Sequence, residues 1–186
     1  MMNSVLVIVG AAPEAKADLD AIGDKTRFDF MAIGLDAADK WLGRYEYVVT
    51  HEPRDLGEFR QRREHLKGNL NFKTYSQEPF LHQVDVVLPE LTAPSAIDLV
   101  PPANYSNELR TIQYYSGSSA LLGVKVGFRL GYRKMILCGV PLLDEKYIGY
   151  RRGWLFVMDL IKDNVRSMSG WTKQIFGEPD EEWLNG

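Results

Sequence analysis

His51 is the side chain best suited to proton transfer, because among the three histidines it alone follows a predicted strand directly. A histidine at the carboxyl end of a buried strand can act as a general base, or can hold a ribose or a base edge. The alternative is an exposed loop histidine. His65 lies among charged residues and is expected to be solvated, and His82 fits no pattern. We therefore predict His51 as the catalytic residue.

A turn of small residues, Gly10-Ala11-Ala12-Pro13, follows the first apolar run. Small side chains let the backbone approach a phosphate or a ribose, and Pro13 suits the first turn of a helix. The alternative is a tight turn that binds no ligand. We predict these four residues as nucleotide-binding. On this hypothesis Gly10→Val clashes with the ligand and leaves the fold intact.

A second small and polar cluster, Ser116-Gly117-Ser118-Ser119, precedes an apolar helical pattern. Backbone N–H groups and hydroxyls at the amino end of a helix can hold a phosphate. A serine can also serve only as the helix cap. Capping needs one serine and this segment has three, which favours a binding site at all four residues.

Gly34 and Asp36 come just after a second predicted strand. In dinucleotide-binding folds an acidic residue near this place accepts the ribose hydroxyls. A helix cap is the alternative for Asp36. Asp144, after the last strand, could meet a metal ion that carries phosphates, although exposed loop acids are commoner. The histidines have no metal-ligand spacing, so no metal ligands are predicted.

Alternating strand and helix patterns must position these residues. Short apolar runs predict strands, and 3.6-residue periodicity predicts helices. The expected strands are residues 5–9, 28–33, 45–50, 72–75, 84–88 and 134–140, and the main helices are residues 14–22, 56–66, 118–130 and 152–165. A long loop is expected over residues 89–107. This order predicts one α/β domain over residues 1–186, with a mostly parallel, Rossmann-like sheet flanked by helices.

The helix over residues 118–130 carries a row of glycines, Gly123, Gly127 and Gly131. Such a row predicts close packing of this helix on the sheet, and Gly131 fits a helix stop. Lys125 and Arg129 are four residues apart, and both are expected to face water.

Composition excludes several classes of protein. The chain has 186 residues, with 22 Lys and Arg against 25 Asp and Glu, giving a net charge of −3. This balance argues against a dedicated nucleic-acid-binding protein. The single cysteine, Cys138, excludes a disulfide framework and suggests a reducing, cytoplasmic setting. No targeting segment or membrane-spanning run is recognisable. The composition leaves open whether the chain forms a homo-oligomer.

Three segments together resemble one superfamily. They are the first turn, the sequence YVVTHEP at residues 47–53, and GSSALLGVKVGFRLGYRKMILCGVPL at residues 117–142. The pattern is similar to the Rossmann-like proteins grouped around archaeal 6-hydroxymethylpterin diphosphokinase. It also resembles the bacterial CMP-sialic-acid-dependent sialyltransferases. The size of the chain also suggests a phage or environmental relative.

The resemblance implies a nucleotide site. It places Gly10–Pro13 at the nucleotide phosphates or ribose, and residues 116–119 at the helix start lining that site. It adds Gly139 and Pro141, which match the end of the strand beneath. His51 falls about where the sialyltransferases place an Asn that contacts the nucleotide.

Three features depart from the two families. Glu14 stands where they usually have Ser, and Gly34 where they usually have Asn. The sialyltransferase catalytic His lies late in the chain, whereas this chain has no His after His82. The nucleotide-binding frame can therefore be kept while the chemistry differs or is lost.

The resemblance implies a nucleotide-dependent transferase, with glycosyl transfer from a sugar nucleotide such as a CMP-sugar as the leading hypothesis. Helix N–H groups, and Arg151 or Arg152, would stabilise the nucleotide phosphate, and His51 would be the base. The alternatives are an ATP-dependent diphosphokinase-like enzyme with Mg²⁺ on Asp36 or Asp144, and a non-catalytic nucleotide-binding protein. In each case the expected partner is a small-molecule nucleotide.

Overall fold

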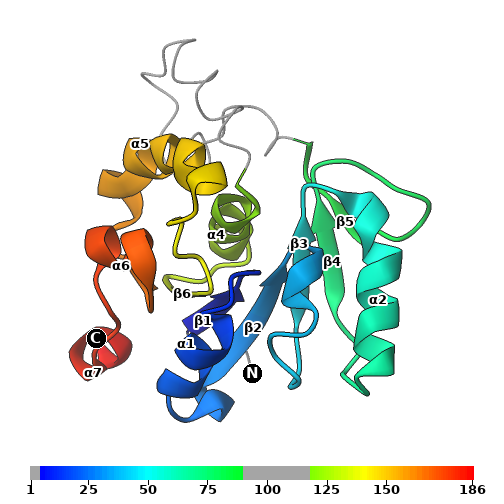
Figure 1. The fold of residues 1–186 in the computed structure, drawn as a ribbon, viewed down its shortest axis with the longest axis horizontal. Helices are drawn as coiled ribbons and strands as arrows, with labels where there is room; N and C mark the ends of the chain where they lie inside the picture. The colour runs from blue at the N-terminus through cyan, green and yellow to red at the C-terminus, as the bar shows by residue number, and fades with distance from the viewer. Residues whose placement is uncertain (1–4, 90–117) are drawn as a thin grey trace.

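The computed structural model describes residues 5–89 and 118–186, and its centre is a seven-stranded parallel sheet (Figure 1). The order across the sheet is β5-β4-β3-β2-β1-β6-β7. The strands are β1 (Val5–Val9), β2 (Phe28–Ile33), β3 (Tyr47–Thr50), β4 (Lys73–Ser76), β5 (Val86–Val87), β6 (Lys134–Cys138) and β7 (Val165–Ser167). The predicted parallel α/β sheet is confirmed.

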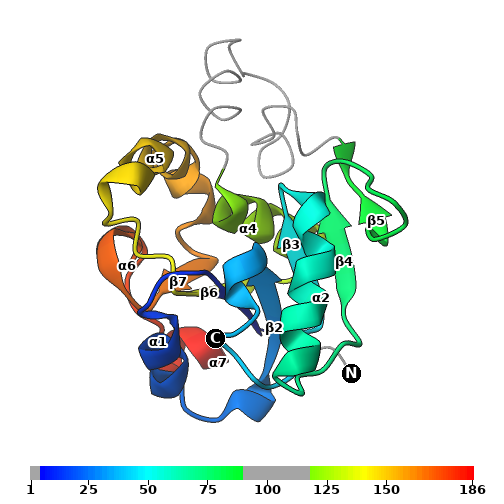
Figure 2. The ribbon, with the colours of Figure 1, turned by 45° about the vertical axis from the view of Figure 1, so that its right-hand side comes forward.

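Helices cover both faces of this sheet (Figures 1 and 2). α1 (Ala15–Ala21) and α2 (Leu56–His65) pack on one face, and α4 (Ser119–Arg129) and α5 (Arg151–Ile161) on the other. Successive residues of β1 alternate between the two cores, because side chains of a strand point to opposite faces. Burial on both faces explains why this strand reads as an uninterrupted apolar run.

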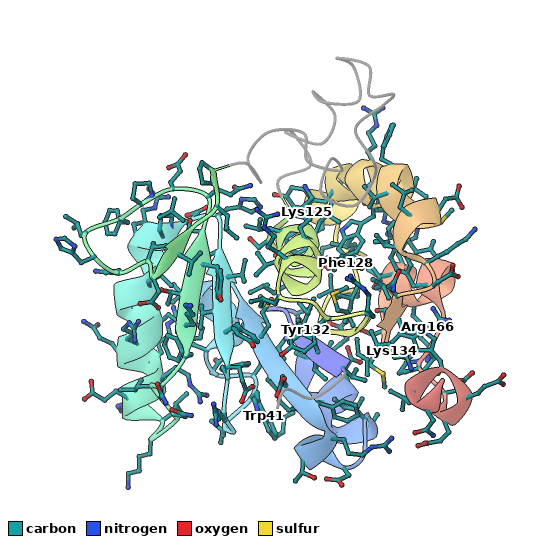
Figure 3. All side chains as sticks on the ribbon, turned by 180° about the vertical axis from the view of Figure 1, so that it is seen from behind. Trp41, Lys125, Phe128, Tyr132, Lys134 and Arg166 are labelled. Atoms are coloured by element: carbon teal, nitrogen blue, oxygen red, sulfur yellow. The ribbon has the colours of Figure 1, made fainter. Side chains whose placement is uncertain are left out.

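Shorter elements complete the chain. The C-terminal helices are α6 (Gly170–Phe176) and α7 (Glu181–Asn185), and the 3₁₀ segments are η1 (Lys25–Arg27), η2 (Leu35–Ala37), η3 (Pro53–Asp55) and the longer η7 (Glu145–Tyr150). Figure 3 shows Lys134 and Arg166 beside α7, where both cations lie over the Trp183 ring, at 5.9 and 5.0 Å from its centroid. These contacts attach the C-terminal segment to the edge of the sheet.

The strand order reverses between β1 and β6. From β1 the chain moves outward through β2, β3, β4 and β5, and then returns to add β6 and β7 on the other side of β1. The connections that follow β1 and β6 therefore leave the sheet in different directions. In open parallel sheets this reversal opens a crevice outside the carboxyl ends of the two strands, where ligands bind.

The predicted helix over residues 152–165 is wrong at its carboxyl end. α5 stops at Ile161, and Val165 begins β7, which pairs with β6. Asn164 turns the chain: its N–H donates to the Ile161 carbonyl, and its own carbonyl accepts the Met135 N–H. Val165 matches the apolar periodicity of the predicted helix, but it is buried because it belongs to the sheet.

The glycine row of α4 packs on the sheet as predicted. A Cβ at Gly123 would lie 3.0 Å from Ile33 Cγ2, and one at Gly127 would lie 3.1 Å from Leu6 Cδ2. Gly131 has φ +96° and ends the helix, as expected. The prediction that Lys125 faces water is wrong, because the residue is only 7% exposed.

Several predictions lie outside the described residues. They concern Ser116, Gly117 and the part of the expected loop beyond Pro89. Within residues 5–89 and 118–186, no helix has the length and apolarity needed to span a membrane.

Candidate functional site

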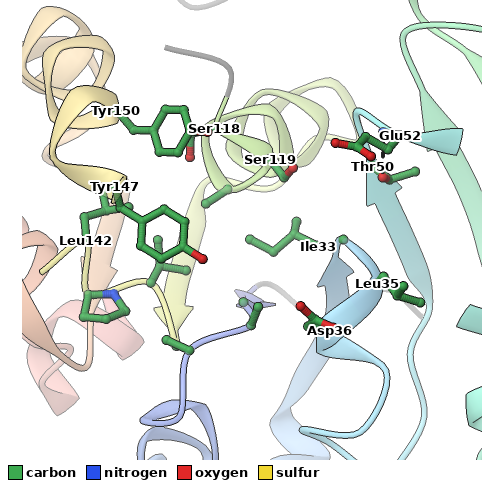
Figure 4. A pocket seen from close by; sticks show the side chains of 18 of the residues that line it. Ile33, Leu35, Asp36, Thr50, Glu52, Ser118, Ser119, Leu142, Tyr147 and Tyr150 are labelled. Carbon is green, nitrogen blue, oxygen red and sulfur yellow. Dashed lines mark hydrogen bonds between the residues drawn. The ribbon is translucent and has the colours of Figure 1, made fainter. Parts of the chain in front are cut away.

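A cavity of about 400 Å³ opens at the crevice between β1 and β6 and extends across the carboxyl ends of β2 and β3 (Figure 4). Its volume lies in the range of small-molecule sites. It brings together most of the predicted nucleotide-binding residues, namely Gly10, Ala11, Ala12, Gly34, Asp36, Ser118, Ser119, Gly139 and Pro141. Pro13 and His51 are not among its lining residues. The nucleotide-binding role of the whole set stays a prediction.

Gly10 and Gly139 form the floor of the cavity, where the ends of β1 and β6 touch. The Gly10 N–H donates to the Cys138 carbonyl at 2.8 Å. A Cβ at Gly10 would lie 2.3 Å from the Gly139 carbonyl oxygen and 2.9 Å from Val140 Cγ2. The expectation that Gly10→Val disturbs only a ligand is therefore wrong, because the first carbon of a side chain already meets backbone.

Three carboxylates lie on one side of the cavity: Asp36 after β2, and Glu52 and Asp55 after β3. Asp36 lies in η2, whose cap is Gly34 at φ +74°, so Asp36 does not cap it. The Asp36 carboxylate accepts from Arg62 at 3.1 Å. An acidic wall of this kind can accept hydrogen bonds from ribose or sugar hydroxyls.

The amino end of α4 forms a second polar region of the cavity lining. Ser118 is the helix cap residue, but its side chain makes no capping hydrogen bond. The alternative, that its hydroxyl serves only as the helix cap, is therefore wrong. Ser118 and Ser119 both line the cavity, beside the first backbone N–H groups of an 11-residue helix. Those N–H groups lack partners within the helix, so hydroxyls and amides converge where an anion would be stabilised.

Tyr147 and Tyr150 also line the cavity, and the residue patterns of the sequence did not single them out. Both belong to η7, and their rings stack with centroids 6.1 Å apart. Figure 4 shows the Tyr147 hydroxyl pointing into the cavity. The available signal was their spacing of three residues, which places both on one side of a 3₁₀ turn just after a predicted strand end.

His51 is outside the cavity lining, between the lining residues Thr50 and Glu52 in the chain. Its Nδ1 is 2.5 Å from the Gln77 Oε1 atom, and its ring also hydrogen-bonds the Ser118 backbone. Burial lowers the pKa of His51 below its ordinary value of 6.5. Nearby, Lys125 adds to this lowering. The ring thus connects the ends of β3 and β4 to the start of α4, and its role as a base stays a prediction.

The two arginines proposed for phosphate binding differ in their surroundings. The Arg151 guanidinium donates to the Leu142 carbonyl from both Nε and Nη2, at 2.9 and 2.6 Å. Arg152 is exposed on α5. Neither belongs to the described cavity lining.

The described residues do not assemble ligands for Mg²⁺. Across residues 5–89 and 118–186, no group of three or more His, Cys, Asp and Glu side chains lies close enough to hold a metal ion. Asp36 is paired with Arg62, and Asp144 is exposed and outside the cavity lining. No step through a metal ion follows from this arrangement.

No protein-family model and no curated protein matches the sequence. Among solved structures, the chain is similar to the sialyltransferase CstII from Campylobacter jejuni in complex with a substrate analogue, cytidine-5'-monophosphate. The TM-score is 0.54 at 15% identity, over 98% of this chain and 88% of that one. A second CstII structure, with CMP-3FNeuAc, gives 0.53 at 14% identity, over 100% and 88%. At this identity the likeness shows a distantly sialyltransferase-like fold.

Proposed function

We propose that this chain transfers a glycosyl group from a CMP-sugar to an acceptor hydroxyl. The observation that carries the proposal is the polarity of the cavity. Hydroxyls and helix N–H groups line it at the start of α4 and on η7, carboxylates line it after β2 and β3, and the described lining contains no cationic side chain. The likeness to a protein solved with CMP and with CMP-3FNeuAc supports the same ligand class.

The charge distribution favours a nucleoside monophosphate over a di- or triphosphate. The Ser118 and Ser119 hydroxyls, the first N–H groups of α4 and the tyrosine hydroxyls can accommodate a single phosphate. Each further phosphate would bring one more negative charge toward Asp36, Glu52 and Asp55, and the described lining offers no cationic side chain to balance it. A CMP-sugar, with one phosphate, fits this balance best.

The proposed reaction is one substitution at the anomeric carbon. The acceptor oxygen forms a bond to that carbon while the carbon–oxygen bond to the phosphate breaks, and CMP leaves with the electron pair. Hydroxyl and N–H donors that face the phosphate stabilise the charge that develops on it. The acceptor proton passes to a base, for which His51 is the sequence prediction and Glu52 is the neighbouring cavity carboxylate.

Ligand binding tests the first half of the proposal. Isothermal calorimetry and thermal shift with CMP, UDP, GDP, ATP and NAD should show CMP as the tightest ligand, with a melting temperature that rises with its concentration. Tyr147→Phe should weaken CMP binding about tenfold and leave cytidine binding unchanged, because the lost hydroxyl would serve the phosphate. The absence of any nucleotide binding at millimolar concentration overturns the proposal.

Turnover tests the second half. Release of CMP from a CMP-sugar should continue in the presence of EDTA and should accelerate with acceptor. Turnover of ATP that depends on Mg²⁺ would support the diphosphokinase alternative, and binding without turnover would support a non-catalytic protein. His51→Ala should lower the rate about 100-fold if this ring moves the proton. If Glu52→Gln has that effect instead, the carboxylate is the base.

A further inference from the structure

Residues 139–142 follow β6 and form one wall of the cavity. Other elements hold the backbone of this wall. Gly139 has φ +67°. Each of the first three wall residues makes a hydrogen bond to a distant segment. The bonds run from the Gly139 N–H to Asp18 Oδ2 (2.8 Å), from the Thr172 hydroxyl to the Val140 carbonyl (2.6 Å) and from the Trp171 N–H to the Pro141 carbonyl (2.8 Å). This wall is therefore fixed before any ligand arrives.

Arg151 holds the fourth wall residue, Leu142. Leu142 is buried and has φ +48°, a left-handed conformation that costs a branched residue free energy. Two N–H groups of Arg151 donate to its carbonyl, and the guanidinium lies over the Trp171 ring, 5.1 Å from the centroid. The forked, planar guanidinium suits two bonds to one acceptor together with stacking on an aromatic face.

The bond between Arg151 and Leu142 closes a loop. Residues 143–150 leave the wall at Leu142 and return at Arg151, and this loop carries Tyr147 and Tyr150. Leu142 and Tyr147 both line the cavity, and Figure 4 shows the hydroxyl of that tyrosine pointing into it. The direction of the tyrosine side chains therefore depends on how the two ends of the loop are held.

We propose that Arg151 is a positioning residue, which fixes the loop of residues 143–150 so that the Tyr147 hydroxyl meets the nucleotide phosphate. The inference rests on the proposed function for the identity of the ligand. Arg151 acts through the loop and does not touch the ligand, because its Nε and Nη2 groups are committed to Leu142 and it is outside the described cavity lining.

The adjacent residue offers a matched control. Arg152→Gln removes the same charge one residue further along α5, from an exposed side chain. Without ligand, hydrogen exchange of the amides in residues 143–150 should speed up at least tenfold in Arg151→Gln and stay at the wild-type rate in Arg152→Gln. Arg151→Lys keeps the charge but loses the fork, so it should also exchange faster. If Arg151→Gln does not fold, the hydrogen-exchange comparison is made with Arg151→Lys instead.

A double-mutant cycle then tests whether Arg151 acts through Tyr147. Arg151→Gln should weaken CMP binding about tenfold. Adding Tyr147→Phe to it should cost little more, because residues acting as one unit are not additive. Full additivity of the two substitutions, or recovery of CMP affinity in Arg151→Lys, would indicate a direct phosphate contact and overturn the proposal. Equal exchange in the two Gln variants overturns it as well. Lack of CMP binding by the wild-type chain overturns the proposed function instead.

Discussion

At the scale of single residues, the contact between Gly10 and the Gly139 carbonyl limits what position 10 can hold. We predict that Gly10→Ala lowers the free energy of unfolding by about 1–3 kcal/mol, because its Cβ must displace backbone that lies 2.3 Å away. Urea denaturation measures the change. Gly149→Ala is the control, since nothing lies within 4 Å of the Cβ added there. Unchanged stability of Gly10→Ala would contradict the packing role.

His51 makes a second prediction at this scale. Its pKa is lowered by burial, so the unfolded chain, with an ordinary pKa of 6.5, binds the proton more readily. The stabilisation from the neutral ring is complete above pH 6.5 and is lost as the pH falls below it. Unfolding free energy measured between pH 7.5 and 5 should fall less steeply in His51→Asn than in the wild type. His65→Asn, at an exposed position, should keep the wild-type slope.

At the scale of elements, α4 combines two features that act together. Its glycines let it lie close to the sheet, and its amino end faces the cavity. Close packing reduces the movement of the first N–H groups, so they are oriented for an anion before it binds. The helix thus couples core packing to the proposed phosphate site.

We predict that Ser118→Ala with Ser119→Ala weakens CMP binding by about 1–3 kcal/mol, because two hydroxyl donors are lost while the helix N–H groups remain. Stability should change by less than about 0.5 kcal/mol, since the Ser118 side chain makes no capping bond. Calorimetry and urea denaturation measure the two effects. A large loss of stability with unchanged CMP affinity would assign the serines to folding.

At the scale of the whole molecule, Asp18 joins three segments that are far apart in the sequence. This buried carboxylate lies on α1 and accepts the Gly139 N–H at 2.8 Å and the Ser169 hydroxyl at 2.7 Å. Through these bonds the first helix fixes the cavity wall after β6 and the segment before α6. The switch point of the sheet is therefore held together by hydrogen bonds as well as by strand pairing.

We predict that Asp18→Ala lowers the free energy of unfolding by about 2–3 kcal/mol, because a buried N–H and a hydroxyl lose their acceptor. Asp18→Asn should cost less, since both bonds end on one carboxylate oxygen and the amide oxygen of Asn can take its place. Asp20→Ala, at an exposed position on the same helix, should change stability by less than about 0.5 kcal/mol. Thermal and urea denaturation measure these free energies. Equal effects of Asp18→Ala and Asp20→Ala would refute the proposed role of Asp18 in joining the three segments.

Local patterns in the sequence were enough to predict the sheet and much of the cavity lining. β1 and β2 match their predicted ranges because short, mostly apolar runs that are buried on both faces are typical strands of a parallel sheet. Gly10, Gly34 and Ser118 were placed at strand or helix ends, and a parallel sheet brings such ends to one edge. The sequence alone therefore predicts which strand and helix ends contribute backbone groups to the cavity.

Tertiary structure decided the rest, because it depends on partners distant in the sequence. Val165 forms a strand through pairing with β6, and Lys125 is buried although its helical spacing predicted exposure. The Arg151 bonds to the Leu142 carbonyl depend on a left-handed residue that no local pattern predicts. Periodicity reports which face of an element is apolar, whereas burial, hydrogen-bond partners and side-chain direction are fixed only when the elements pack together.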